Sequence, residues 1–279
     1  MTSAQETRAG EAGGPPRLGF LGAGTMGGTV AAGLVASGHP GELIGVTSRT
    51  PDTRERLAER LGVRPFETNT GAAAWADVVV IGVKPHAAGG LLDEVRTQVG
   101  DQKLVISLCA GLATTALESH LEPGARVVRV MPNTPSAVGA GMAGISAGSC
   151  ATQGDLDLAV ALMSAVGRAV VVPESQQNAL AALSGSGPAW VFYGVEALIE
   201  SGVAQGLPRS LATELVVQTV RGSAQLLAET GQHPSLAREA VTSPGGTTAA
   251  GLRVLDQRAV RAAVVDAVDA CVRRAGELG

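Results

Sequence analysis

Apolar runs of strand length recur through the N-terminal part of the chain, separated by longer stretches with helical periodicity. The run at 77–83, DVVVIGV, has no polar alternation, which is typical of a strand buried on both faces. Strands are predicted directly after Arg17 and at 42–47, 77–83, 103–109, 126–131, 142–146 and 169–172. Helices are predicted between them at 25–37, 51–61, 86–98, 114–121 and 152–166. This alternation indicates an α/β fold with a Rossmann-type, doubly wound parallel sheet.

The strand signal ends at Pro173, and only helical patterns follow. Three long helices are predicted at 187–205, 208–230 and 258–277, with shorter ones at 234–241 and 248–255. Pro208 suits the first turn of a helix, and Gly231 suits the position just past its end. We therefore predict a Rossmann dinucleotide-binding domain at 17–173 and an all-α domain at 174–279.

The first residues of the chain, MTSAQETRAGEAGGPP, are small and polar. They lack the apolar stretch of a secretory signal, so residues 1–16 are predicted to form a disordered N-terminal extension. No apolar run in the sequence reaches the roughly 18 to 20 residues that a membrane span needs. A membrane partner is therefore not expected.

The composition excludes several classes of function. A net charge of −4 and an aromatic content of 2% provide neither a basic surface nor a stacking platform for nucleic acid. Cys109, Cys150 and Cys271 are far apart in the sequence and form no CxxC pair. Neither a disulfide framework nor a metal site is expected, which fits a protein of the reducing cytoplasm.

The sequence GAGTMG at 22–27 has the spacing G-x-G-x-x-G. Such hexamers are common, but this one closes a predicted strand and opens a predicted helix, as a dinucleotide site requires. Gly22 would permit the tight turn, Gly24 the approach of the pyrophosphate, and Gly27 the close packing of helix on sheet. The alternative is a glycine-rich turn that binds no ligand. The context favours phosphate binding at the helix N-terminus.

The end of the second predicted strand bears on the choice between NAD and NADP. NAD specificity usually places an Asp or Glu there, about 20 residues after the glycines. This chain has Thr47-Ser48-Arg49-Thr50 instead, with no acid to accept from the ribose hydroxyls. Arg49 suits a 2′-phosphate, although it could also be a solvated residue beside a helix-capping Thr50. The predicted cofactor is NADPH, with NADH possible.

Two further strand ends fall on the edge of the sheet where doubly wound folds bind ligands. VKPH at 83–86 ends the third strand, and CAG at 109–111 ends the next. Both are predicted to form loops along the cofactor. Lys84 could also be an ordinary surface lysine, although the chain has only one other, Lys103.

The predicted helical domain has few of the side chains that usually protonate a developing alkoxide, which are Lys, His and Tyr. Residues 151–279 contain no lysine, and their only histidine, His233, is expected to begin a helix before Pro234. Tyr193 lies in an apolar helical stretch and is expected to pack in a core. A reductase built this way would need chemistry with little proton transfer from side chains.

Five segments carry a more specific signal. They are VKPH, RVMPNTP, ALSGSGPAWVFYGVEAL at 182–198, GLPRSLA at 206–212 and ETGQHPSLAREAVTSPGGTTAAGLRVL at 229–255. Together they resemble pyrroline-5-carboxylate reductase, from Arg17 to the C-terminus, and SPGGTT after HP is their most specific part. Trp190 is a departure, because the family more often has Tyr there. The resemblance implies a Rossmann domain and a helical dimerisation and substrate domain, in dimers that can assemble into decamers.

The resemblance implies an enzyme that reduces 1-pyrroline-5-carboxylate to L-proline with NADPH or NADH, the last step of proline biosynthesis. The implied cofactor contacts are Gly22, Ala23, Gly24, Thr25, Met26, Gly27, Ser48, Arg49, Asn69, Val83, Lys84, Pro85, Leu108, Cys109 and Ala110. The implied substrate contacts are Glu174, Ser243, Gly246, Thr247 and Thr248, and Thr248 also takes the catalytic position.

The implied chemistry agrees with the scarcity of acids. The substrate is a cyclic imine with a carboxylate, and its nitrogen is basic enough to be substantially protonated near neutral pH. Hydride can then add to the ring carbon while the nitrogen keeps its proton. We expect the backbone amides of 246–248 and the Ser243 hydroxyl to hold the carboxylate, with Thr248 hydrogen-bonded to the ring nitrogen.

Three other kinds of protein could have the same two-domain plan. A β-hydroxyacid reductase would usually place a catalytic lysine in the helical half, where this chain has none. An imine reductase for larger amines would need no carboxylate site, so SPGGTT argues against it. The same loop argues against a non-catalytic NADP-binding protein.

Overall fold

The computed structural model describes residues 14–277, which form two compact units, 14–181 and 182–277. The first unit contains a sheet with helices, and the second contains helices only. The predicted extension at 1–16 therefore falls largely outside the described residues. The predicted boundary near Pro173 lies shortly before the division between the units.

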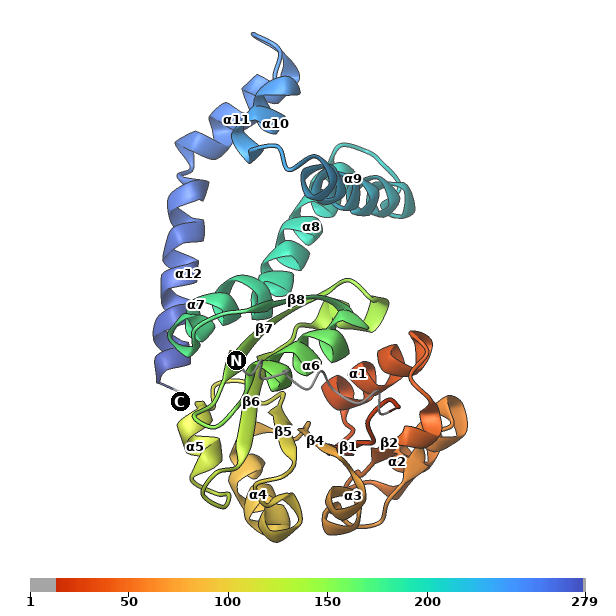
Figure 1. Cartoon of the computed structure of the whole chain (residues 1–279). Coiled ribbons are helices and arrows are strands. Elements are labelled where there is room, and N and C mark those ends of the chain that lie inside the picture. Colours follow the sequence, from red (N-terminus) through yellow and green to blue (C-terminus); the bar gives the residue numbers. More distant parts are fainter. Residues whose placement is uncertain (1–13, 278–279) are drawn as a thin grey trace, which may run out of the picture. The chain divides into compact units, whose positions relative to one another are not determined.

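An eight-stranded sheet forms the centre of the first unit (Figure 1). Its strand order is β3-β2-β1-β4-β5-β6-β7-β8. The strands are β1 (Leu18–Leu21), β2 (Ile44–Val46), β3 (Arg64–Pro65), β4 (Val78–Ile81), β5 (Leu104–Ser107), β6 (Arg126–Met131), β7 (Gly141–Ala147) and β8 (Gly167–Val171). The predicted Rossmann-type fold is confirmed. The chain runs outward from β1 to β3 and then returns to β4, so the loops after β1 and β4 flank the switch point where such sheets bind ligands.

The sheet departs from the predicted parallel arrangement at one place. β7 pairs antiparallel with β6, whereas every other neighbouring pair is parallel. The connection between them holds only the 3₁₀ helix η2 (Thr134–Val138), and a parallel crossover needs about a dozen residues or more. α6 lies between β7 and β8 and returns the chain to a parallel pairing.

Helices cover both faces of the sheet and separate two apolar cores. They are α1 (Thr25–Ala36), α2 (Pro51–Leu61), α3 (Asn69–Trp75), α4 (Pro85–Val99), α5 (Thr114–Glu118), α6 (Gln153–Ser164) and α7 (Gln177–Leu180), with the 3₁₀ helices η1 (Gly41–Leu43) and η3 (Glu174–Gln176). One core joins buried side chains of α1, α2 and α6, and the other joins those of α3, α4 and α5. Strand side chains such as Ile106 and Val105 alternate between the two cores, which explains the continuous apolar runs in the sequence.

β3 and α3 were not predicted. β3 has only two residues and includes Pro65, which cannot donate to a ladder and therefore weakens a strand pattern. α3 is short, and Thr68 caps it by accepting a hydrogen bond from the Gly71 amide at 3.1 Å. The consequence for function is that Asn69 stands at the start of a helix rather than in a loop.

The second unit contains five helices besides the π-helical turn η4 (Ala181–Gly185) that leads into it. They are α8 (Gly187–Ala204), α9 (Arg209–Thr230), α10 (Pro234–Ala240), α11 (Thr247–Gln257) and α12 (Val260–Gly276). α8 and α9 approach closely at Gly202, where an added Cβ would lie 3.2 Å from Cβ of the buried Ala212. Pro208 precedes α9 rather than lying inside it, and Gly231 ends it in the left-handed conformation, as predicted.

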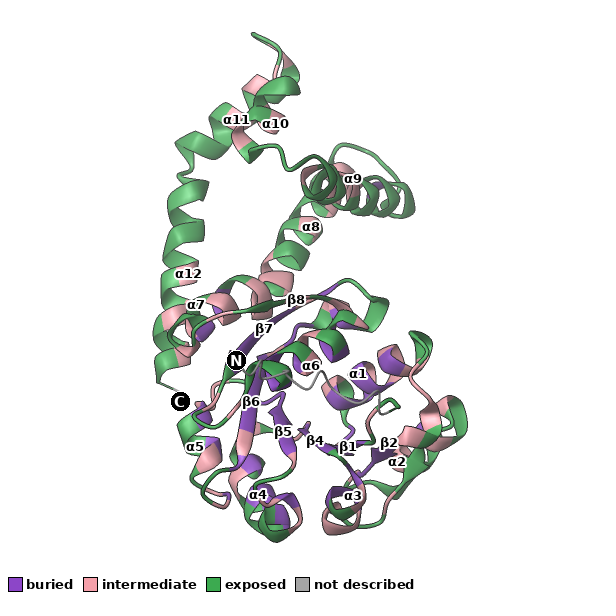
Figure 2. Cartoon of the chain, in the orientation of Figure 1, coloured by how far each residue is buried: buried purple, intermediate pink, exposed green. Residues whose placement is uncertain are grey.

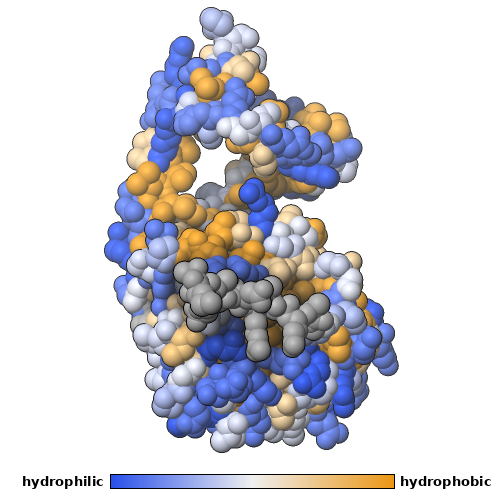
Figure 3. Space-filling model, viewed as in Figure 1, coloured by the Kyte–Doolittle hydropathy of each residue, from blue (hydrophilic) through white to orange (hydrophobic). Residues whose placement is uncertain are grey.

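Large apolar side chains of the second unit are exposed. α8, α10, α11 and α12 contain no buried residue (Figure 2). The expectation that Tyr193 packs in a core is wrong for the single chain, because Tyr193 is 76% and Phe192 63% exposed. Figure 3 shows apolar side chains at the surface of this unit, where Val264 and Val265 of α12 are more than half exposed. No helix among the described residues is long and apolar enough to cross a membrane.

Candidate functional site

The glycine turn joins β1 to α1, and its three glycines have different surroundings. Gly22 has a φ of +87°, and an added Cβ would lie 2.5 Å from Cγ1 of Val83. An added Cβ at Gly27 would lie 3.0 Å from the Gly22 oxygen. Nothing lies within 4 Å of the corresponding position at Gly24. Gly22 and Gly27 are therefore required by the fold, whereas Gly24 leaves space that a ligand can occupy.

The start of α1 supplies unpaired amides beside that space. The first helical hydrogen bond runs from the Gly28 amide to the Gly24 oxygen at 2.8 Å. The amides of Thr25, Met26 and Gly27 precede it and have no partner within the helix. The first turn carries no acidic residue, so the positive end of the helix dipole is not neutralised. This end of the helix suits a phosphate group.

The segment after β2 contains the buried Thr47 followed by three more accessible polar residues. Thr47 is 4% exposed, whereas Arg49 is exposed and makes no hydrogen bond or ion pair with a described residue. Ser48 accepts a hydrogen bond from the Thr50 amide at 3.3 Å. Thr50 takes the N-cap position of α2, but its side chain makes no capping hydrogen bond. Arg49 is thus available for a 2′-phosphate.

Asn69 lies close to the glycine turn although it follows the turn by more than forty residues in the sequence. Its Oδ1 accepts a hydrogen bond of 2.7 Å from the Thr47 hydroxyl, and the same hydroxyl accepts one of 3.0 Å from the Gly22 amide. Its Nδ2 donates to Oε2 of Glu94 on α4 at 3.0 Å. The structure therefore brings this predicted cofactor contact together with the turn. Thr47 and Glu94 were not recognised from the sequence.

The other predicted cofactor loops follow β4 and β5 and touch each other. The Leu108 amide donates to the Ile81 oxygen at 2.9 Å, and the Cys109 thiol donates to the Val83 oxygen at 3.3 Å. Burial raises the pKa of the Cys109 thiol, and its hydrogen bond with Ser107 opposes this effect only in part. Cys109 therefore stays a thiol near neutral pH and offers a ligand only its backbone. Lys84 and Pro85 begin α4.

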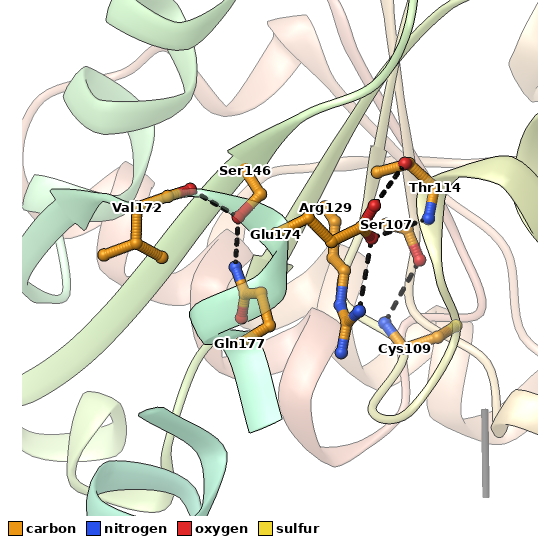
Figure 4. A network of polar contacts seen from close by, with 8 residues as sticks. All are labelled: Ser107, Cys109, Thr114, Arg129, Ser146, Val172, Glu174 and Gln177. Atoms are coloured by element: carbon orange, nitrogen blue, oxygen red, sulfur yellow. Dashed lines mark hydrogen bonds and ion pairs between the residues drawn. The ribbon is translucent and has the colours of Figure 1, made fainter. Parts of the chain in front are cut away.

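Glu174 is held by a network inside the first unit (Figure 4). Its carboxylate accepts hydrogen bonds from the Thr114 amide at 2.7 Å, the Thr114 hydroxyl at 2.6 Å and Nη1 of Arg129 at 3.2 Å. Arg129 is 5% exposed and lies in register with Ser107 on β5 and Ser146 on β7. Three polar residues thus form a row across an otherwise apolar part of the sheet. Both oxygens of Glu174 have partners, so its predicted contact with substrate would use the lone pairs that remain.

Gln177 anchors the same segment one turn later. Its side chain is fully buried, and its Nε2 donates to Oγ of Ser146 at 2.8 Å. Ser146 in turn donates to the Val172 oxygen at 2.7 Å. The start of the helical part of the sequence is therefore hydrogen-bonded to the sheet through Glu174 and Gln177. The role of Arg129 was not predicted, although an arginine inside the apolar strand RVVRVM is itself a sign that a charged partner lies nearby.

The SPGGTT loop connects α10 to α11 in the second unit. Gly245 has a φ of +72°, and the Gly246 amide donates to the Ser243 oxygen at 3.0 Å. Gly246 is the N-cap of α11, and the first helical hydrogen bond runs from the Ala250 amide to the Gly246 oxygen at 3.1 Å. α11 begins at Thr247, one residue earlier than predicted. The amides of 247–249 therefore precede the helical hydrogen bonds and are free to bind an anion, whereas the Gly246 amide, which was also expected to bind the carboxylate, is already paired with Ser243.

Two hydroxyl groups of this loop are also available to a ligand. Ser243 and Thr248 are exposed, and neither hydroxyl bonds to a described residue. No acidic residue lies in the first turn of α11. His233, the histidine of the helical half, caps α10 by accepting a hydrogen bond from the Ser235 amide at 3.2 Å, as predicted. The loop thus combines amide and hydroxyl donors without a general acid, which suits a carboxylate ligand.

The residues of the first unit fit a phosphorylated dinucleotide. The open position at Gly24, the amides of α1 and the free guanidinium of Arg49 match its pyrophosphate and 2′-phosphate. Among the described residues, no group of three or more His, Cys, Asp or Glu side chains is arranged to hold a metal ion.

Comparisons with known proteins agree with a cofactor-binding N-terminal part and a separate helical part. Residues 174–278 match the family model for pyrroline-5-carboxylate reductase dimerisation. Residues 17–111 match the model for coenzyme F420-dependent NADP oxidoreductases. The chain is 40% identical to a pyrroline-5-carboxylate reductase of Methanosarcina acetivorans, over 94% of this chain and 98% of the relative.

Two solved structures are similar over nearly the whole chain. The pyrroline-5-carboxylate reductase of Coxiella burnetii has 39% identity and a TM-score of 0.90, and the match covers 95% of this chain and 98% of that one. The pyrroline carboxylate reductase of Plasmodium falciparum, solved with NADP bound, has 30% identity and a TM-score of 0.86 with the same coverage.

Proposed function

This chain belongs to the pyrroline-5-carboxylate reductase family, and we propose on that basis that its SPGGTT loop holds the carboxylate of 1-pyrroline-5-carboxylate while the protonated ring is reduced to L-proline. The enzyme is an oxidoreductase of this type, and it uses NAD(P)H. The observation that carries the proposal is the start of α11, where free amides and two hydroxyls meet without an acid.

The roles of the chain's own residues follow from the charge of the substrate. The amides of 247–249 and the Ser243 hydroxyl donate hydrogen bonds to the carboxylate and thereby fix the ring. The Thr248 hydroxyl accepts a hydrogen bond from the protonated ring nitrogen and orients it. A nicotinamide cofactor held at the glycine turn would supply hydride for the imine carbon, whose neighbouring nitrogen keeps its proton. Positioning alone can contribute about 7 to 11 kcal/mol in favourable systems, so a general acid is not required.

The role of Thr248 is tested by two substitutions that differ in the hydroxyl. Thr248→Val removes the hydroxyl at almost unchanged volume and is expected to lower kcat/KM for 1-pyrroline-5-carboxylate by roughly tenfold to a hundredfold, the range for a hydrogen bond to a charged group. Thr248→Ser keeps the hydroxyl and should retain most of the activity. Steady-state kinetics at saturating NADPH measure both. Unchanged kcat and KM in Thr248→Val would contradict the orienting role.

The preference for NADPH is assigned to Arg49. Arg49→Ala is expected to weaken NADPH binding by roughly tenfold or more, because it removes a charge-assisted contact with the 2′-phosphate. NADH lacks that phosphate, so its Kd should stay unchanged and serves as the internal control. Titration of each cofactor in the absence of substrate gives both constants. An equal loss for the two cofactors would show that Arg49 does not bind the 2′-phosphate.

Self-association through the second unit completes the proposal. The dimerisation model covers this unit, and its helices expose Phe192, Tyr193 and Val265. Burying such side chains stabilises an assembly by about 25 cal/mol for each Å² of apolar surface removed from water. We propose that a second copy covers these faces, and that dimers assemble further into decamers.

A further inference from the structure

All three polar groups of Thr47 make hydrogen bonds, one to β1 and two to the glycine turn. Its amide donates to the Phe20 oxygen at 2.9 Å, and its carbonyl accepts from the Ala23 amide at 2.8 Å. Its hydroxyl accepts from the Gly22 amide at 3.0 Å. The last of these bonds uses the side chain, so the identity of residue 47 affects how the turn is held. Thr47 is only 4% exposed, so the Gly22 amide depends on this hydroxyl for its hydrogen bond.

The hydroxyl also determines the orientation of Asn69. A hydroxyl that accepts from an amide keeps one hydrogen to donate, and here it donates to Oδ1 of Asn69 at 2.7 Å. The Glu94 carboxylate can only accept, and it lies 3.0 Å from Nδ2 of Asn69. Both neighbours therefore require the same orientation of the amide. The second Nδ2 hydrogen has no acceptor among the described residues.

We propose that Thr47 is a positioning residue of the cofactor site, which sets the turn that receives the pyrophosphate and orients Asn69 to offer an N–H to a cofactor phosphate. An Asn69 oriented the other way would present its oxygen to that anion and repel it. The four groups form one hydrogen-bond chain from the Gly22 amide to the Glu94 carboxylate. The proposal concerns cofactor binding alone and holds whichever imine is reduced.

The test compares Thr47→Val with Thr47→Ser. Val removes the hydroxyl and leaves the Gly22 amide and the Asn69 oxygen without partners, whereas Ser keeps both bonds. Titration with NADPH alone, followed by nicotinamide fluorescence, should show a Kd raised roughly tenfold in Thr47→Val and changed by less than about twofold in Thr47→Ser. A purely structural role would lower the melting temperature of Thr47→Val without changing the Kd of the folded protein, and equal Kd values for the two variants would overturn the proposal.

Asn69→Ala tests whether Thr47 affects cofactor binding through Asn69. This test does not require Thr47→Val to be stable. Asn69→Ala leaves the Thr47–Gly22 bond in place and is expected to raise the NADPH Kd. In the double variant, Thr47→Val should add only about a threefold increase, because part of its effect passes through Asn69. An unchanged Kd in Asn69→Ala would contradict the orientation of Asn69, and effects that multiply in the double variant would contradict the coupling.

Discussion

Gly246→Val is expected to lower kcat/KM for 1-pyrroline-5-carboxylate by roughly two to three orders of magnitude, the loss of two or more hydrogen bonds to a charged group. Gly246 has a φ of −76°, so the backbone itself tolerates a side chain. An added Cβ would lie 3.2 Å from the Ser243 oxygen, and the methyl groups beyond it would cover the amides of 247–249. The carboxylate would then lose its binding site.

Gly251→Val is the matched control for this prediction. It places the same side chain at the fifth residue of α11, where nothing lies within 4 Å of an added Cβ. Its activity should stay within a few-fold of the wild type, because valine is no worse a helix former than the glycine it replaces. NADPH affinity should be unchanged in both variants. Full activity in Gly246→Val would show that the loop is only a turn.

Gly24→Val should abolish measurable NADPH binding, with a Kd raised by at least roughly a hundredfold, because the side chain would fill the space left for the pyrophosphate. The fold should tolerate the change, since no atom lies within 4 Å of an added Cβ and the φ of −76° is an ordinary one. The melting temperature without cofactor should therefore stay close to that of the wild type. Isothermal titration with NADPH and a thermal melt measure the two effects separately.

Valine at two other glycines provides the comparisons for this test. Gly154→Val lies in the first turn of α6, where an added Cβ would make only an ordinary contact of 3.7 Å. It should leave NADPH binding intact. Gly22→Val combines a φ of +87° with a contact of 2.5 Å and should lower the melting temperature instead. Normal NADPH affinity in Gly24→Val would show that the cofactor does not bind at the glycine turn.

The sequence predicted best what depends on local pattern. The apolar runs identified β1 to β8 apart from β3, and the helix 51–61 matches α2 residue for residue. The different surroundings of Gly22, Gly24 and Gly27 agree with the functions inferred from their spacing. Such features follow from the periodicity of strands and helices and from the steric demands of a turn, both of which are encoded within a few residues.

Features that depend on distant residues could not be predicted. β7 pairs antiparallel with β6 because the connection between the two strands is too short for a parallel crossover. The ion pair of the buried Arg129 with the half-buried Glu174 joins residues on β6 and after β8, and the sequence shows neither partner's location. Tyr193 was expected to pack in a core because an apolar helical stretch looks the same whether its own chain or a second copy covers it. The contact of Glu174 with substrate stays a prediction.

Reduction of the imine by this protein is tested by a single assay on the purified wild-type chain. 1-Pyrroline-5-carboxylate is added to enzyme and NADPH, and the loss of nicotinamide absorbance is followed together with the proline formed. We expect oxidation that depends on the imine, with one proline produced for each NADPH consumed, and a loss of that activity in Gly246→Val with NADPH binding retained. NADPH binding by the wild type without imine-dependent oxidation would contradict this expectation.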